Sequence, residues 1–164
     1  MIVLNQSEQP MSYVVSKSGG VAFESGEDRA RIIVSANDSC GRYSLLEWTV
    51  AANELPVGEQ REYGSHLHHR CEETFLIQSG SLEFLIGDEV ATLSAGDFAR
   101  VPPGVRHGYQ NVSGEPVVML VTFTPGGIEE LFLKYRSDQP EIKGAGFVSD
   151  ATRYHGSEFG LPYP

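Results

Sequence analysis

The most informative stretch of this 164-residue chain is His66-Leu67-His68-His69-Arg70-Cys71-Glu72-Glu73. Residues two apart in a β-strand point to the same face, so His66 and His68 can direct their imidazoles at one point. Imidazole and carboxylate groups are both ligands for transition metals. Glu73 follows His68 at an odd spacing, and an unbroken strand would place it on the opposite face. The sequence therefore predicts a bend over 69–72 that brings Glu73 back to the histidines.

A third histidine follows a segment of turn-forming residues. Pro102-Pro103-Gly104 forces a tight corner, and the chain is predicted to resume as a strand at 107–111. His107 and Tyr109 would share one face of that strand. The sequence thus predicts one metal site inside a β-barrel, with four ligands: His66, His68, Glu73 and His107.

Short β segments separated by turns are predicted along most of the chain. Strands are expected at 11–16, 31–35, 43–51, 66–68, 73–78, 82–86, 89–93, 98–101, 107–111 and 116–124. Gly87-Asp88 is typical of a hairpin. After the last strand, the apolar residues at 128, 131, 132 and 135 have the spacing of a short amphipathic helix. Many short strands without intervening helices indicate an all-β sandwich or barrel.

Composition narrows the class of partner. A length of 164 residues suits one domain, and no internal repeat or long linker divides the chain. The net charge of -10 argues against nucleic acid or an anionic membrane as a main partner. Two cysteines, Cys40 and Cys71, are too few for a disulfide scaffold, although a bridge between them stays open. No apolar run is long enough to span a bilayer and no secretory leader is evident, so a cytoplasmic location is expected.

Two motifs resemble those of the cupin superfamily. The first, His-x-His followed by Glu and Gly, is matched by His66, His68, Glu73 and Gly80. The second, Gly-x5-Pro-x-Gly-x2-His-x3-Asn, is matched by Gly96, Pro102, Gly104, His107 and Asn111. The sequence departs from the first motif where Gln60 replaces a usual glycine. The resemblance covers residues 43–125 and implies the cupin double-stranded β-helix, a jelly-roll barrel. A single domain over 1–164 is expected, with a C-terminal helix at 128–135 and a tail to 164.

A looser resemblance extends to small cupins grouped with quercetin 2,3-dioxygenases. It is carried by Pro125-Gly126-Gly127, the helix that follows and the tail at 154–159. It implies a mononuclear metal-dependent dioxygenase that acts on a small aromatic or enolic substrate together with dioxygen. Glu73 would be a ligand and also a catalytic proton acceptor. One divalent transition metal ion is expected, and the sequence does not choose among Fe, Mn, Ni, Co, Cu and Zn.

The same four ligands would also serve other functions. One alternative is a Lewis-acid isomerase, decarboxylase or lyase that acts on a small carbonyl substrate. Another is a cupin that binds a small molecule without catalysis. A DNA-binding regulator is disfavoured because no helix-turn-helix pattern or basic segment is present. The resemblance to small cupins also implies a homodimer.

Several neighbours of the ligands need an interpretation of their own. Phe75, Ile77 and Tyr109 are candidates for contact with the substrate, and packing in the core is an equal alternative for them. Three adjacent polar residues are not expected to bind the metal: His69, Cys71 and Glu72. His155, in the tail, is predicted to face solvent.

Overall fold

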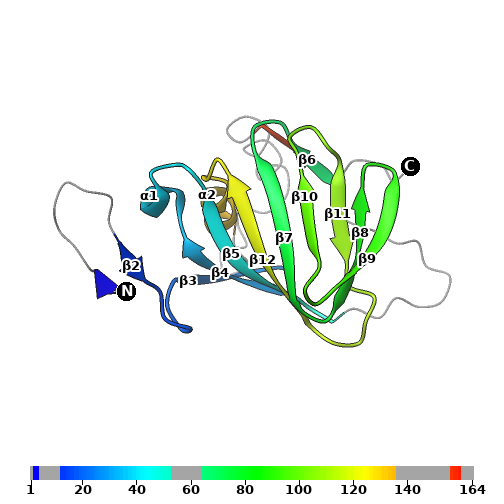
Figure 1. Cartoon of the computed structure of the whole chain (residues 1–164), viewed down its shortest axis with the longest axis horizontal. Coiled ribbons are helices and arrows are strands. Elements are labelled where there is room, and N and C mark those ends of the chain that lie inside the picture. The colour runs from blue at the N-terminus through cyan, green and yellow to red at the C-terminus, as the bar shows by residue number, and fades with distance from the viewer. Residues whose placement is uncertain (1, 4–11, 53–63, 136–155, 160–164) are drawn as a thin grey trace.

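The computed structural model of the chain describes residues 2–3, 12–52, 64–135 and 156–159, and it shows two facing β-sheets (Figure 1). The six-stranded sheet contains, in spatial order, β10 (Phe98–Val101), β7 (Glu72–Ser79), β12 (Val117–Thr124), β5 (Ser44–Val50), β4 (Asp28–Val34) and β3 (Val21–Ser25). The five-stranded sheet contains β13 (Ser157–Phe159), β6 (His66–His68), β11 (His107–Gln110), β8 (Ser81–Ile86) and β9 (Glu89–Ser94). The strands β1 (Ile2–Val3) and β2 (Tyr13–Val14) pair separately and project from one end.

The chain crosses between the two sheets repeatedly. β6 lies in the five-stranded sheet, β7 in the other, β8 and β9 in the first again, then β10, β11 and β12 alternate. All described strand pairs are antiparallel. This winding is the predicted double-stranded β-helix, and the all-β prediction is confirmed.

Alternating side chains build the core between the sheets. In β5 and β12 every second residue is buried, as expected when one face of a strand packs inward. The fully enclosed side chains come from both sheets and include Leu46, Phe75, Phe84, Met119 and Phe123. One end of this interior is polar, and there the candidate ligands lie.

Two short helices accompany the barrel. α2 (Glu129–Lys134) confirms the predicted helix, and its Phe132 packs against Trp48 of β5 and Phe123 of β12. α1 (Ala36–Ser39) lies where a turn was predicted. The turn becomes helical because Ser35 and Asp38 form a capping box, in which each side chain bonds the backbone N–H of the other. Neither described helix has the length and apolar character needed to cross a membrane.

A hairpin that the sequence did not predict completes the six-stranded sheet. β3 and β4 are joined by a two-residue turn, Gly26–Glu27, and Gly26 adopts a φ of 67° that suits glycine. β3 exposes most of its residues and buries Phe23, whose ring lies 5.9 Å from that of Trp48. The hairpin thus belongs to the barrel wall, and its tip reaches the polar end of the interior.

Candidate metal centre

Three histidines lie side by side on the five-stranded sheet. β6 and β11 are adjacent, and their register places His107 directly opposite His66. His68 lies two residues after His66, on the same side of β6. The ring centroids of His66 and His107 are 4.3 Å apart, and those of His66 and His68 are 5.0 Å apart. The strand positions predicted for the three imidazoles are therefore those in the structure.

Glu73 reaches the histidines from the opposite sheet. The chain bends after His68 and crosses to the six-stranded sheet, where Glu73 lies on β7 opposite Phe123 of β12. The predicted bend is present, but it does not simply return Glu73 to the strand face that carries the histidines. It carries Glu73 to the facing sheet, so the carboxylate meets the imidazoles across the barrel interior.

The four ligand atoms converge on one small volume. Glu73 Oε2 lies 2.8 Å from His107 Nε2, 3.0 Å from His68 Nε2 and 3.8 Å from His66 Nε2. All four ligand atoms lie within 4.8 Å of one another. Two ligands of one transition metal ion, each at about 2.1 Å, are separated by about 3 Å when adjacent and about 4.2 Å when opposite. The observed separations fit a single ion with three nitrogen ligands and one oxygen ligand.

The far nitrogens of the imidazoles have their own partners. His66 Nδ1 lies 2.8 Å from the Gly64 carbonyl, and His107 Nδ1 lies 3.0 Å from the Val105 carbonyl. A carbonyl oxygen only accepts, so these two Nδ1 atoms carry hydrogen. His68 Nδ1 lies 2.7 Å from Ser157 Oγ of β13. Such partners fix the ring orientation of metal-binding histidines.

The hydrogen-bond partners of the Nδ1 atoms leave the Nε2 lone pairs available to bind a cation at the centre. A neutral imidazole with hydrogen on Nδ1 presents a lone pair at Nε2. In His107 that lone pair faces Glu73 Oε2, another acceptor, at 2.8 Å. Two acceptors this close repel unless a proton or a metal ion lies between them. The donor set therefore fits a divalent transition metal ion, which would be held by His66, His68, Glu73 and His107.

Mutual charge sets the protonation of the centre. In the metal-free centre, burial raises the pKa of the Glu73 carboxyl, but the contacts of Glu73 with the His107, His66 and His68 imidazoles outweigh burial and hold that pKa well below its usual range. Burial lowers the pKa of His107, yet the hydrogen bond and charge of Glu73 raise it above its ordinary value. For His66 burial prevails and the pKa is lowered, because Glu73 is farther away. Glu73 is therefore ionised at neutral pH.

The polar neighbours of the ligands point elsewhere. Glu72 forms an ion pair with Arg100 of β10, and His69 is exposed. Cys71 is buried, and burial together with Glu73 raises the pKa of its thiol to about 12, which keeps it protonated. Cys40 and Cys71 are both free thiols. His155 and Gln60 lie outside the described residues.

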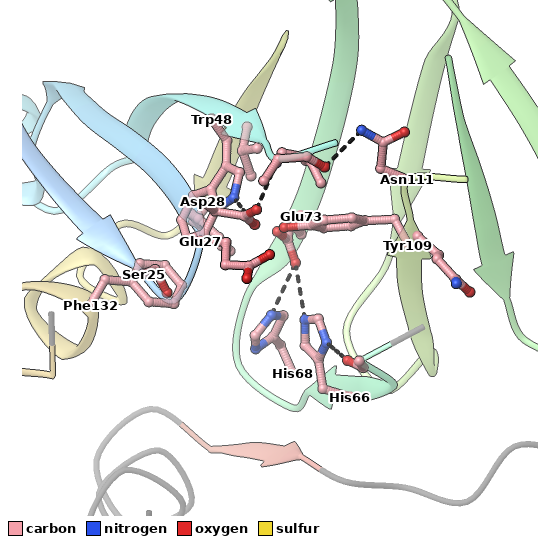
Figure 2. Close-up of a pocket in the computed structure, with 16 residues that line it drawn as sticks. Ser25, Glu27, Asp28, Trp48, His66, His68, Glu73, Tyr109, Asn111 and Phe132 are labelled. Carbon is pink, nitrogen blue, oxygen red and sulfur yellow. Dashed lines mark hydrogen bonds and ion pairs between the residues drawn. The ribbon is translucent and has the colours of Figure 1, made fainter. Parts of the chain in front are cut away.

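A cavity of about 420 Å³ opens beside the centre. Figure 2 shows His66, His68 and Glu73 on its wall, with Tyr109 of β11 and Trp48 of β5 facing the same space. Its aromatic lining residues are Trp48, Tyr109, Phe123 and Phe132. Burial, with the charges of Asp28 and Glu73, raises the pKa of Tyr109 well above 10, so its phenol keeps its proton as a hydrogen-bond donor.

The substrate candidates from the sequence separate in the structure. Tyr109 lines the cavity, whereas Phe75 and Ile77 do not and belong to the hydrophobic core. They share the buried face of β7 with Glu73, as predicted, but that face turns into packed core beyond the carboxylate. Phe75 supports the centre from behind, with its ring 6.1 Å from those of His107 and Tyr109.

Other residues at the cavity were not identified from the sequence. Glu27 and Asp28 come from the β3–β4 hairpin, and Ser157 approaches His68 from 89 residues away. The glycine turn at Gly26 was the only local sign of the hairpin. No local pattern could have revealed Ser157, because its partnership depends on pairing between β13 and β6.

Known proteins resemble this chain in both sequence and fold. The cupin domain family matches residues 53–123. Quercetin 2,3-dioxygenase of Bacillus subtilis is 23% identical over 120 residues, which are 73% of this chain and 33% of that enzyme. The chain therefore spans about a third of the length of this curated relative.

Solved structures share the barrel. An uncharacterized conserved protein with a double-stranded β-helix domain from Klebsiella pneumoniae is 26% identical, with a TM-score of 0.54 over 71% of this chain and 92% of that one. A predicted oxalate decarboxylase from Thermotoga maritima is 16% identical, with a TM-score of 0.59 over 69% of this chain and 99% of that one. The matched domain, the two sequence motifs and the double-stranded β-helix together identify a cupin domain within this chain.

Proposed function

We propose that this cupin is a mononuclear metal-dependent enzyme, a dioxygenase that acts on a small aromatic or enolic substrate. One observation carries the proposal: three imidazoles and a carboxylate converge within 4.8 Å at the wall of an aromatic-lined cavity. Four protein ligands leave coordination positions for other molecules, as catalytic centres require. The cavity volume of about 420 Å³ suits a small ring system.

The chain's own residues would divide the work. His66, His68, Glu73 and His107 would hold one divalent transition metal ion. That ion would supply a Lewis acid and, if redox-active, a route for electrons between substrate and dioxygen. Both oxygen atoms would enter the substrate, so that no separate reductant is needed.

Glu73 would act as the proton acceptor. Its carboxylate is ionised at neutral pH and lies at the cavity wall, within reach of a substrate hydroxyl. Deprotonation of an enol or phenol is the step that this arrangement supports.

The remaining cavity wall would orient the substrate. The faces of Trp48, Phe123 and Phe132 can contact a planar ring and exclude water from it. Tyr109 can donate a hydrogen bond to a substrate oxygen, since its phenol stays protonated. The similarity to a quercetin 2,3-dioxygenase supports a substrate of this kind, at 23% identity.

Metal identity and oxygen uptake test the proposal. Protein purified without added metal should contain Fe, Mn, Ni, Co or Cu by elemental analysis. An oxygen electrode should then record uptake of about one dioxygen per molecule of a flavonol such as quercetin. Bound zinc, or no uptake after reloading with each redox-active ion, would overturn the dioxygenase proposal and favour Lewis-acid chemistry at the same ligands.

A further inference from the structure

The charged residues around the cavity constrain the charge of the substrate's substituents, in addition to the ring system proposed above. We infer that the substrate carries no negative charge apart from the oxygen directed at the candidate metal centre, and that its outer substituents are neutral or cationic. The inference rests on the proposed function. It follows from the β3–β4 hairpin, which places two further carboxylates at the cavity.

The described cavity wall contains acidic residues without basic ones. Glu27, Asp28 and Glu73 line it, and none of the described lining residues is a lysine or an arginine. In Figure 2 the Glu27 and Asp28 side chains lie on the side of the cavity opposite His66 and His68. The described arginines nearest in sequence pair outside the cavity: Arg29 with Glu24, and Arg31 with Glu47.

Hydrogen bonds hold the Asp28 carboxylate of the hairpin in position. Asp28 Oδ2 accepts from Trp48 Nε1 at 2.9 Å, and Asp28 Oδ1 accepts from the Ala51 backbone N–H at 2.9 Å. Both donors are uncharged, so they orient the carboxylate without neutralising it. Asn111 continues the network by donating to the Ala51 carbonyl at 2.8 Å. The charge is therefore built into the wall and tied to β5.

The balance of charge leaves room for one anionic group. A divalent ion with Glu73 as ligand would carry one net positive charge, which a single enolate or phenolate oxygen neutralises. A second negative charge on the substrate would find no cation in the described wall and would face Glu27 and Asp28. Asp28 is half-buried and Glu27 is exposed, so repulsion between like charges would be stronger at Asp28 and more screened by solvent at Glu27. Carboxylate-bearing substrates are therefore disfavoured.

The aromatic wall favours the opposite charge. Trp48, Tyr109, Phe123 and Phe132 present ring faces and edges to the same space as the two hairpin carboxylates. Rings with nearby carboxylates are the environment in which proteins bind organic cations. A protonated amine on the outer part of the substrate is thus the charge that the wall accommodates best.

Three catechols that differ in one substituent test the inference. They are 4-methylcatechol, which is neutral, dopamine, which is cationic, and protocatechuate, which carries a carboxylate. Binding to the metal-loaded full chain is measured by calorimetry under anaerobic conditions, so that no turnover is needed. Protocatechuate should bind at least about tenfold more weakly than 4-methylcatechol, and dopamine at least as tightly. The difference in affinity between protocatechuate and the other two catechols should become smaller as salt is added.

Charge reversal on the hairpin locates the effect. Glu27→Lys should raise the affinity for protocatechuate relative to 4-methylcatechol by about tenfold. The matched control is Glu24→Lys, which changes the net charge equally on the same hairpin. The Glu24 side chain is 59% exposed and does not line the cavity. In this variant the ratio of the affinities for protocatechuate and 4-methylcatechol should therefore stay as in the native chain.

The outcomes separate the two proposals. If protocatechuate binds as tightly as 4-methylcatechol, or if Glu24→Lys alters the ratio as much as Glu27→Lys, the charge inference is wrong and the proposed function stands. If none of the three catechols binds to protein that contains the metal, the proposal of an aromatic substrate is wrong, and the charge inference fails with it.

Discussion

At the scale of single residues, the centre depends on one carboxylate shared by three histidines. Glu73 is 5% exposed, and its Oε2 lies within 3.8 Å of all three Nε2 atoms. The spacing of these residues in the sequence predicted that their side chains converge, because β-strand geometry fixes which side chains share a face. The sequence could not identify the groups that hold the ligands, such as Ser157, since those come from distant strands.

Glu73→Gln should change how stability depends on pH in protein stripped of metal. The pKa of Glu73 is lowered by folding, so its contribution is present above about 4.5 and lost as pH falls further. The pKa of His107 is raised, so its contribution is present below about 6.5 and lost as pH rises through the folded value.

The free energy of unfolding should therefore differ most between wild type and Glu73→Gln at pH 4.5–6.5. Breaking a buried pair costs about 3 kcal/mol. Urea denaturation followed by circular dichroism measures the difference across pH. A difference that is constant from pH 4 to pH 9 would show that the pair does not couple to folding.

Ser157→Ala should weaken metal binding without unfolding the barrel. Ser157 Oγ lies 2.7 Å from His68 Nδ1, and loss of such a partner typically lowers metal affinity about 10–100-fold. Competition with a chromophoric chelator measures the affinity. Ser94→Ala at an exposed position of β9 is the control and should bind as wild type does. Equal affinity of both variants would assign Ser157 a packing role alone.

At the scale of elements, the strands with clean alternation were predictable and the hairpin was not. β5, β7 and β12 alternate buried and half-buried residues, and their apolar and β-branched content is what identified them in the sequence. β3 buries little besides Phe23 and has no such pattern. The bend after His68 was predictable from parity. That it crosses between sheets was not, because sheet membership is a long-range property.

The corner before β11 should affect metal binding through its geometry. Gly104 has a φ of 80° and donates its N–H to the His68 carbonyl at 2.7 Å, which ties the corner to β6. Gly104→Ala would strain the backbone by about 1–2 kcal/mol. The control is Gly41→Ala, at a φ of 77° in the turn between α1 and β5, with no atom near the added Cβ.

Thermal unfolding should show a similar loss of stability in both glycine variants. Only Gly104→Ala should also lose metal affinity, measured with the same chelator, since its strain falls on the loop that positions His107. Equal metal affinity in the two variants would mean that the corner does not position the ligand.

At the scale of the whole molecule, the cupin barrel followed from two motifs and regular turns. The hydrophobic pattern of the sequence did not predict which strand forms the outer edge of the six-stranded sheet. β3 forms that edge, and its Val21 is 51% exposed. Edge strands with exposed apolar residues tend to pair with other chains. This edge supports the expected homodimer, which remains a prediction.

Light scattering after size exclusion should give twice the 17.9 kDa chain mass. Val21→Lys should shift the mass towards that of one chain, because a charge on the edge opposes pairing. Val112→Lys, at an exposed position outside the strands, is the control. A single-chain mass for the wild type would overturn the dimer.

The most direct test of the metal centre is metal content per chain. Elemental analysis compares wild type with His66→Ala, His107→Ala and the control His69→Ala, whose histidine is exposed beside the ligands. We predict about one transition metal ion per chain in wild type and His69→Ala, and a much lower metal content in the other two variants, because each of them lacks one of the four ligands. Unchanged metal content in His66→Ala and His107→Ala would contradict the account.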